Sequence, residues 1–220
     1  MNDLDEITTL VINYRTPDLL QKCIGSFLLH YPGRKMMIVD NGSDDNSITI
    51  IRQIALQNPN VQFIFNSKNI YHGPALDQGL RAVQTRFAFT LDSDCEVIRS
   101  GFLENMLPYY SDPRCYAVGE LMYMNRFGYK LSSDQSGSIR YIHPSSMLVD
   151  RTKYAKLRKF SHHGSPCLAN MKDAARAGYS LVDFPIGDYI FHSGRGTCSR
   201  YGYSLGIRHL LEYLINRAIH

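Results

Sequence analysis

Short apolar runs alternate with longer amphipathic segments over residues 1–98. The apolar runs have the length and the branched side chains of buried strands, and they occupy residues 7–13, 36–40, 61–66 and 87–92. The segments between them predict helices at residues 16–30, 44–57 and 73–85, the first of them with Thr16 as its N-cap. This order predicts an α/β fold with a parallel sheet, right-handed crossovers and ligands beyond the carboxyl ends of the strands.

The pattern changes character after Asp94. We expect a helix at residues 101–110, strands at 116–124, 141–149, 180–184 and 189–192, a helix at 169–177 and a final amphipathic helix at 203–219. A stretch rich in Gly and Ser at 128–138 predicts a hairpin or a mobile loop. No repeat or linker divides the chain, so we expect one domain, residues 1–220, with functional halves at 1–98 and 99–220.

Composition narrows the class of protein. With 220 residues and 44% hydrophobic side chains the chain can bury a substantial core, and it holds no apolar run long enough to cross a membrane. Its acidic start lacks the parts of a signal peptide, and its five scattered cysteines contain no CxxC pair. We therefore expect reduced thiols and a cytoplasmic protein.

Charge is distributed unevenly along the chain. Residues 1–150 carry 13 Lys and Arg against 16 Asp and Glu, whereas residues 151–220 carry 11 against 4. A basic last third suits an anionic ligand or a membrane surface. For the apolar stripe of the final helix we favour docking on the sheet over peripheral contact with the inner face of a membrane. No RNA-binding signature accompanies the charges, so we expect no nucleic-acid partner.

Two carboxylates, Asp92 and Asp94, end the fourth apolar run. Residues i and i+2 of an extended chain share a face, so these side chains can converge just past the strand end. Carboxylate oxygens suit Mg²⁺ or Mn²⁺ and leave positions open for a diphosphate. Asn13 and Asp40 end the first two predicted strands and are expected at the same edge. An Asp-x-Asp pair alone also occurs in loops that only cap helices, so agreement among several motifs must support the site.

Four motifs follow one another with a specific spacing, Thr9-Leu-Val-Ile-Asn13-Tyr14, Ile38-Val-Asp40-Asn-Gly-Ser-Asp-Asp45, Asn69-Ile-Tyr-His-Gly-Pro-Ala-Leu-Asp77-Gln-Gly79 and Leu91-Asp-Ser-Asp94. Together they resemble family 2 glycosyltransferases of the GT-A fold, in the nucleotide-diphospho-sugar transferase superfamily. The resemblance continues more weakly through residues 144–150, 177–179 and 192–197. It implies a Rossmann-like, mostly parallel sheet flanked by helices, with a nucleotide-sugar-binding half at 1–98 and an acceptor-side half at 99–220.

The resemblance also implies roles for single residues. Asp40 matches the carboxylate that holds the base and ribose of the donor, and Asp92 matches the acid that meets the ribose or a metal-bound water. Asp94 and His192 match the residues that complete the site of the diphosphate and of a divalent cation, Mn²⁺ or Mg²⁺. The other donor-binding candidates are Asn13, Asn69, Gly73, Asp77 and Arg195.

Three features depart from the family's pattern. Tyr71 stands where the family commonly has glycine, and Asp77 stands where it commonly has asparagine, and both changes bear on the choice of donor. Inverting members also carry an acidic pair before an Ala-Gly-Tyr motif, here residues 177–179, and one of those acids deprotonates the acceptor. Residues 160–172 contain no carboxylate.

Three explanations of the missing carboxylate stay open. His162 or His163 could act as the base, because imidazole titrates near neutrality, and we take His163 as the catalytic candidate. Alternatively the enzyme retains anomeric configuration, with the leaving diphosphate helping to deprotonate the acceptor. The third explanation is a domain that binds sugar nucleotide or glycan without turnover.

The sequence therefore predicts a metal-dependent glycosyltransferase that moves a sugar from a nucleoside diphosphate to a hydroxyl acceptor. UDP, GDP and dTDP sugars are open as donors, and glycans, lipid-linked glycans and proteins are open as acceptors. A non-catalytic glycan-binding or scaffold module of the same fold is the rival from another class. A sugar nucleotidyltransferase is the rival enzyme, disfavoured because the first strand runs into Asn13-Tyr-Arg-Thr-Pro17 and not into a glycine-rich triphosphate loop.

Overall fold

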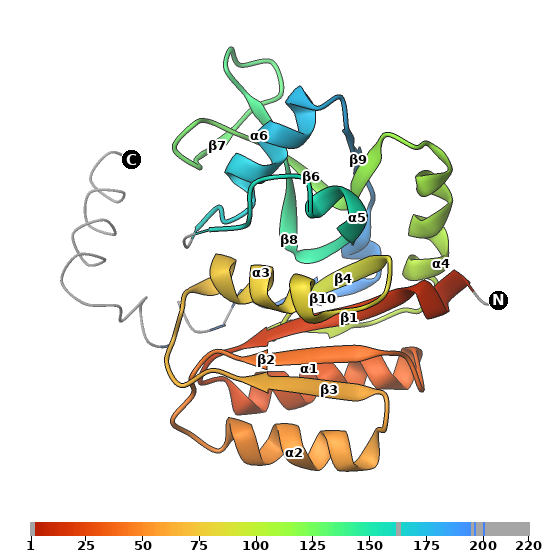
Figure 1. Ribbon diagram of the computed structural model, residues 1–220, viewed down its shortest axis with the longest axis vertical. Helices are drawn as coiled ribbons and strands as arrows, with labels where there is room; N and C mark the ends of the chain where they lie inside the picture. The colour runs from red at the N-terminus through yellow and green to blue at the C-terminus, as the bar shows by residue number, and fades with distance from the viewer. Residues whose placement is uncertain (1–2, 162–163, 195, 197–199, 201–220) are drawn as a thin grey trace.

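The computed structural model describes residues 3–161, 164–194, 196 and 200, and at its centre is a mixed sheet (Figure 1). Four strands lie side by side and parallel in the order β3, β2, β1, β4. They span Val61–Phe65, Met36–Asp40, Ile7–Asn13 and Phe87–Asp92 respectively. Because they run in one direction, their carboxyl ends form a single edge of the sheet.

Beyond β4 the sheet becomes antiparallel. Strand β8 (Ile139–Asp150) pairs antiparallel with β4, and β6 (Cys115–Met124) pairs antiparallel with β8. Strand β6 also pairs with the short β7 (Lys130–Leu131) and, in parallel, with β9 (Ser180–Asp183). A separate two-stranded ribbon joins β5 and β10, which span Cys95–Val97 and Ile190–His192.

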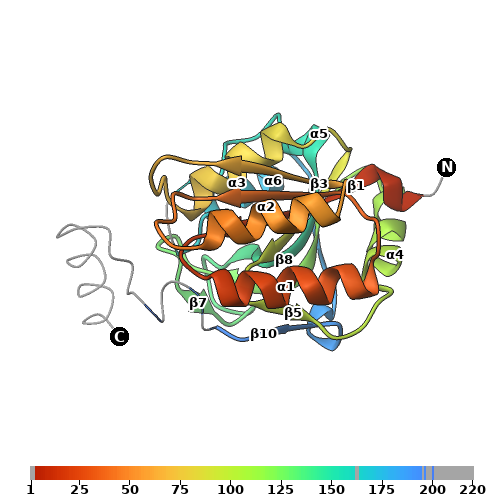
Figure 2. The same ribbon diagram turned by 90° about the horizontal axis from the view of Figure 1, so that it is seen from below.

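Helices cover both faces of the sheet. Figure 2 shows α1 and α2 together on one face, with α3 behind the strands on the other. The first face carries α1 (Pro17–His30), α2 (Ser47–Gln57) and α4 (Phe102–Met106), and the second carries α3 (His72–Ala82), α5 (Arg151–Tyr154) and α6 (Leu168–Arg176). Short 3₁₀ turns at Asp3–Glu6, Leu107–Ser111 and Ile186–Asp188 complete the described elements.

Strand β1 shows why the core has two halves. All seven of its residues are buried, and successive side chains point to opposite faces of the sheet. Val11 packs in the cluster that contains Phe27 of α1, whereas Leu10 packs in the cluster that contains Leu80 of α3. A strand buried on both faces has the continuous apolar sequence that β1 shows, and not an alternating one.

The structure differs from the sequence expectations at the starts and ends of a few elements. The helix expected at 44–57 begins at Ser47, because the preceding residues form a turn whose Ser43 amide donates to the Asp40 carboxylate. The helix expected at 101–110 becomes 3₁₀ at Leu107, where Pro108 has no amide hydrogen to continue the α-helical ladder. The short β5 and α5 were not expected from the sequence.

Two expectations concern the end of the chain and the membrane. The helix expected at 203–219 lies outside the described residues and stays a prediction. None of the helices within the described part of the chain has both the length and the apolar character needed to cross a membrane. Cys23, Cys95, Cys115 and Cys167, the cysteines that the structure describes, are buried and free.

Candidate active site

The parallel register of β1 and β2 places Asn13 beside Asp40, and both side chains are fully buried. Asn13 Nδ2 donates to Asp40 Oδ2 at 2.8 Å, and Ser43 donates to the same carboxylate through its amide and its hydroxyl, each at 2.8 Å. An ionised carboxylate can accept about four hydrogen bonds. These three bonds fix the orientation of Asp40 and leave about one acceptor position for a sugar nucleotide. Donor contact by Asn13 and Asp40 stays a prediction.

Thr16 links this pair to the aspartate motif. Its hydroxyl donates to Asn13 Oδ1 at 3.0 Å and lies 3.1 Å from the hydroxyl of Ser93. Thr16 is the N-cap residue of α1, as expected, but its side chain makes no hydrogen bond to the start of the helix. The buried Oδ1 of Asn13 needs a hydrogen-bond donor. The Thr16 hydroxyl donates to it, and is therefore not used for a capping bond to the helix.

The ribbon of β5 and β10 brings His192 to Asp94, because His192 pairs with Cys95 across it. His192 Nε2 lies 3.1 Å from Asp94 Oδ1, and the amide of Gly196 donates to Asp94 Oδ2 at 3.0 Å. A Cβ atom at position 196 would lie 2.9 Å from that oxygen, so glycine permits the close approach. Both residues predicted to hold the metal are therefore adjacent at the carboxyl edge.

The two side chains of this pair shift one another's ionisation. The hydrogen bond with Asp94 raises the pKa of His192, against the opposing effect of burial. Burial opposes ionisation of Asp94, but the hydrogen bond and charge of His192 and the Gly196 amide outweigh it, so the pKa of Asp94 is lowered. The geometry thus favours an ionised carboxylate at position 94.

Asp92 ends β4 and faces a second imidazole. His72, the first residue of α3, places its Nε2 3.6 Å from Asp92 Oδ1. Both side chains are about a quarter exposed, at 27% for His72 and 23% for Asp92, so they are accessible from the edge. The negative charge of Asp92 also contributes to raising the pKa of His192, which places Asp92 in the same electrostatic environment as Asp94 and His192, the pair predicted to bind the metal.

His143 and Glu120 complete the cluster, although neither was selected from the sequence. The His143 ring lies 5.9 Å from the His192 ring, centroid to centroid, and its Nδ1 lies 2.7 Å from the Ser145 hydroxyl. Burial lowers the pKa of His143, while the charges of Asp92 and Glu120 act in the opposite direction. We call Asp92, Asp94, His72, His143, His192 and Glu120 the carboxyl-edge cluster.

One sequence signal could have located His143. Pro144 follows it inside a segment that otherwise reads as a strand, and proline inside a strand marks an edge or a bulge. The structure has such an irregularity there, because Gly119 pairs with Met147 whereas Leu121 pairs with Ile142. Glu120 carries no comparable signal, since its place opposite the bulge depends on the pairing of β6 with β8.

Asn69 holds the loop that precedes α3. Its Oδ1 accepts from Asn41 Nδ2 at 3.0 Å and from the amide of Tyr71 at 2.8 Å. Tyr71 has φ of 76° and ψ of 159°, a backbone conformation that is adopted almost only by glycine. The position where the family commonly has glycine therefore keeps the glycine conformation with a tyrosine side chain. Donor binding by Asn69 stays a prediction.

Gly73 and Asp77 connect α3 to the segment that precedes α6. A Cβ atom at Gly73 would lie 2.6 Å from the backbone carbonyl carbon of Ser161, so only glycine permits this contact. Asp77 Oδ1 accepts from the Tyr154 hydroxyl at 2.6 Å, and the same hydroxyl accepts from the amide of Phe160 at 3.1 Å. These contacts anchor the chain on α3, and donor binding by Gly73 and Asp77 stays a prediction.

Two of the predicted site residues fall where the structure gives no description. His163, the candidate base, and Arg195, a donor-binding candidate, lie outside the described residues. Their predicted roles are unchanged by the geometry above.

The residues at the edge fit a divalent cation. Ligand atoms of Asp94, Cys95 and His192 all lie within 4.8 Å of one another. Burial raises the pKa of the Cys95 thiol well above its usual value, and its Sγ donates to the carbonyl of Ser145 at 3.6 Å, so Asp94 and His192 are the better candidates for ligands. The oxygen of Asp94 and the nitrogen of His192 are donors that Mn²⁺ accepts, with further positions left for phosphate oxygens.

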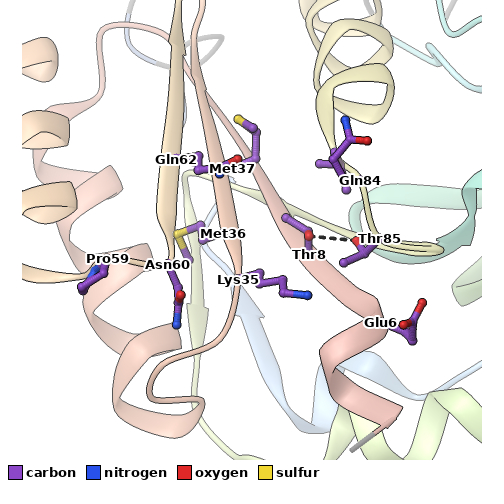
Figure 3. Close-up of a pocket in the computed structure, with 11 residues that line it drawn as sticks. Glu6, Thr8, Lys35, Met36, Met37, Pro59, Asn60, Gln62, Gln84 and Thr85 are labelled. Atoms are coloured by element: carbon purple, nitrogen blue, oxygen red, sulfur yellow. Dashed lines mark hydrogen bonds between the residues drawn. The ribbon is translucent and has the colours of Figure 1, made fainter. Parts of the chain in front are cut away.

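A hollow of about 370 Å³ lies at the other end of the sheet (Figure 3). Its lining includes Thr8 near the start of β1 and Thr85 just after α3, whose hydroxyls share a hydrogen bond of 2.8 Å. No residue of the carboxyl-edge cluster lines it. The hollow is therefore at the amino ends of the parallel strands, away from the site described above.

Comparison with known proteins identifies the family. A family model described as glycosyl transferase family 2 matches residues 8–175. The chain belongs to glycosyl transferase family 2. The resemblance predicted from the four sequence motifs is thereby confirmed, and the matched range contains Asp92 and Asp94.

Curated relatives of this family 2 chain include poly-beta-1,6-N-acetyl-D-glucosamine synthases of Staphylococcus aureus. The synthase of strain MSSA476 is 26% identical over 119 residues, and that of strain COL is 25% identical over the same length. Each match covers 54% of this chain and 29% of the synthase, so the chain spans less than a third of these relatives.

Among solved structures, the chain is similar to mannosyltransferase PcManGT from Pyrobaculum calidifontis, which was solved in complex with GDP-Man and Mn²⁺. The TM-score is 0.65 at 16% sequence identity, and the match covers 82% of this chain and 55% of the mannosyltransferase. This likeness confirms the predicted GT-A fold, a mostly parallel sheet flanked by helices.

Proposed function

We propose that this family 2 chain transfers a sugar from a nucleoside-diphosphate donor to a hydroxyl acceptor, with a divalent cation held by Asp94 and His192. The carrying observation is the contact of 3.1 Å between these two side chains, 98 positions apart in the sequence. They meet at the carboxyl edge of the parallel strands, where ligands of such sheets bind.

The chain offers several groups to the negative charge of a diphosphate. Helix α3 has 11 residues and begins at His72, which lies 3.6 Å from Asp92, so the positive end of the helix is at the site. The protonated form of His72 would add charge there, and Arg195 is predicted to do the same. A divalent cation, when bound, supplies Lewis-acid stabilisation of the departing diphosphate.

The names of the similar proteins suggest which donors to test first. The curated relatives are named for a polymer of N-acetyl-D-glucosamine, and the solved mannosyltransferase holds GDP-Man with Mn²⁺. UDP-N-acetylglucosamine and GDP-mannose are therefore the first candidates, followed by other UDP and dTDP sugars. The acceptor class, a glycan, a lipid-linked glycan or a protein, is not narrowed by these likenesses.

A thermal-shift screen tests donor and metal together. The purified chain is melted with nucleoside diphosphates and sugar nucleotides, each with Mn²⁺, with Mg²⁺ and with a chelator. Binding to the folded state at 100 times Kd stabilises it by about 2.7 kcal/mol, which a melt detects readily. We expect a shift that requires both the nucleotide and the metal, and a folded protein that shows none with any pair contradicts the proposal.

Turnover separates the enzyme from its rivals. Release of nucleoside diphosphate from the selected donor in the presence of Mn²⁺ indicates transfer or hydrolysis. Metal-dependent binding without any release indicates a glycan-binding or scaffold module of the same fold. Release of pyrophosphate from a nucleoside triphosphate and a sugar phosphate indicates a nucleotidyltransferase.

A further inference from the structure

We propose that Glu120 is the catalytic base, the carboxylate that takes the proton from the acceptor hydroxyl. The inference rests on the proposed function and adds one residue to the same site. It answers a question that the sequence leaves open, because residues 160–172 contain no carboxylate.

The carboxylate nearest to that segment in the sequence is engaged elsewhere. Asp173, in α6, lies 3.1 Å from Arg158 Nε and 3.6 Å from Arg176 Nη1. Two guanidinium groups thus occupy the Asp173 carboxylate. Asp173 is therefore a structural residue, and we look for the base in another part of the chain.

The pairing of β6 with β8 delivers Glu120 to the carboxyl-edge cluster. Gly119 pairs with Met147 and Leu121 pairs with Ile142, so residues 143–146 of β8 stand opposite the single residue Glu120 and form a bulge in this pairing. That bulge carries His143, whose ring lies 5.9 Å from the ring of His192. Bulges re-aim side chains and occur beside active sites more often than chance.

The backbone around Glu120 is fixed while its side chain is exposed. The amide of Leu121 donates to Asp183 Oδ1 at 3.0 Å, and the carbonyl of Gly119 accepts from the amide of Phe184 at 2.9 Å. A Cβ atom at Gly119 would lie 2.9 Å from the carbonyl oxygen of Ser146, so glycine lets β6 close on the bulge. Glu120 thus stands on a rigid strand, which is the placement that a catalytic group needs.

Glu120 lies level with the carboxyl end of β4. Its neighbour Gly119 pairs with Met147 of β8, and Met147 pairs with Thr90 of β4, so Glu120 stands at the same edge of the sheet as Asp92. Its position on β6, in the half of the chain that the family resemblance assigns to the acceptor, suits an acceptor hydroxyl between Glu120 and the donor.

The chemical step balances without another reactant. The acceptor oxygen forms a bond to the anomeric carbon of the donor, and the bond from that carbon to the diphosphate oxygen breaks. The electron pair leaves with the diphosphate, and the hydroxyl proton passes to the Glu120 carboxylate. Attack opposite the leaving group makes this an inverting transfer, so the proposal also commits to the stereochemistry of the product.

The test compares Glu120→Gln with matched variants in the full chain. The donor is the sugar nucleotide selected by the thermal-shift screen, and the acceptors are water and a panel of alkyl glycosides. Asp173→Asn is the control, because it removes a carboxylate that is engaged in ion pairs. Glu120→Asp keeps the carboxylate, and His163→Ala tests the rival base. Affinity for the nucleoside diphosphate with Mn²⁺, turnover and the anomeric configuration of the product are measured for each.

We expect Glu120→Gln to lower turnover by about 10²–10⁴-fold, the usual share of general-base catalysis, with metal-dependent nucleotide affinity within about twofold of wild type. Glu120→Asp should regain part of that loss, and Asp173→Asn should turn over like wild type. Turnover of Glu120→Gln within threefold of wild type, or a product with retained configuration, overturns the assignment. Equal loss of nucleotide binding in Glu120→Gln also overturns it, because a base does not hold the donor.

Failure of the proposed function gives a different result. If the wild-type chain binds no nucleotide with Mn²⁺, the family function itself is contradicted, whatever the Glu120 variants do. If it binds nucleotide but releases none with any acceptor, the site is a binding site and Glu120 is not a base. Loss of turnover with His163→Ala and not with Glu120→Gln would assign the proton to His163.

Discussion

Asp94 and His192 lie 3.1 Å apart although 98 positions separate them, and a two-stranded ribbon of only three residue pairs brings them together. Each supports the ionisation of the other, since the pKa of Asp94 is lowered and that of His192 is raised. This ion pair keeps the Asp94 carboxylate ionised, which is the form that binds a cation. In the proposed site Asp94 and His192 would hold the cation, and binding would release the proton from His192.

The first prediction removes these ligands. Asp94→Asn and His192→Ala should each abolish Mn²⁺-dependent binding of the nucleoside diphosphate, measured by titration calorimetry, because the site loses one of its two protein ligands. His192 is exposed at the edge, so His192→Ala should change the free energy of unfolding by less than about 1 kcal/mol. Asp112→Asn, a change at a carboxylate whose partner is Arg114, is the control. Wild-type titrations for both ligand variants would sink the metal assignment.

The second prediction concerns the hydrogen bonds by which the Tyr154 hydroxyl joins α3 to the segment before α6. Tyr154→Phe deletes the hydroxyl that donates to Asp77 at 2.6 Å and accepts from the amide of Phe160 at 3.1 Å. Both groups then lose a partner in a mostly buried place, so we expect a loss of about 1–3 kcal/mol in the free energy of unfolding. Urea denaturation measures it, with Tyr109→Phe at an exposed position for comparison. A loss below about 0.5 kcal/mol would show that the hydrogen bonds of the Tyr154 hydroxyl contribute little to stability.

The third prediction is a pH dependence at Asp150, a fully buried residue. Burial opposes its ionisation, but hydrogen bonds from Thr152, Lys153 and Arg86 outweigh burial, so the pKa of Asp150 is lowered. A lowered pKa in the folded state stabilises the protein above the unfolded pKa of about 3.9, and this contribution is lost as the pH falls through the folded value. Acid unfolding of the wild type should therefore steepen below about pH 4.

Asp150→Asn isolates that contribution. The change leaves Lys153, 11% exposed, without its charge partner at 3.2 Å, and we expect it to cost about 3–5 kcal/mol at neutral pH. The deficit relative to wild type should shrink as the pH falls from about 4 toward the lowered folded pKa of Asp150, because the carboxylate of the unfolded wild type is protonated first and the folded state then loses its advantage. Asp188→Asn, at an exposed residue, is the control. A deficit that stays constant from pH 7 to pH 3 would show that the carboxylate charge is not responsible.

Local patterns were enough to predict the parallel half of the fold. Strands such as β1 and β2 are continuous apolar runs that end in a polar residue, so both their bounds and their shared edge follow from the sequence. Asp94 could be placed for the same reason, because it follows a strand directly. The family match then confirmed the resemblance that these motifs suggested.

The arrangement of β6 and β8 could not be predicted in the same way. Glu120 lies opposite the bulge that carries His143 only because β6 and β8 pair with a shifted register, and register depends on contacts between segments far apart in the chain. The hydroxyl of Thr16 can bond either to the start of its helix or to Asn13. Which bond forms depends on where the fold places Asn13, and that is not visible in the local sequence. Non-local pairing is thus the information that short motifs lack.

The last prediction concerns Tyr71, which keeps a φ of 76° and a ψ of 159° where the family commonly has glycine. A side chain in this region costs about 1–3 kcal/mol, and glycine relieves it at an entropic cost of about 0.5–1 kcal/mol. We therefore expect Tyr71→Gly to be more stable than Tyr71→Ala by about 1 kcal/mol in urea denaturation, because both lose the ring but only alanine keeps the Cβ strain. Since the loop joins Asn41 to α3 beside Asp92, Tyr71→Gly should also change the ranking of sugar nucleotides in the melt. Equal stabilities for the two variants would show that the conformation is unstrained, and an unchanged ranking would show that the ring takes no part in donor choice.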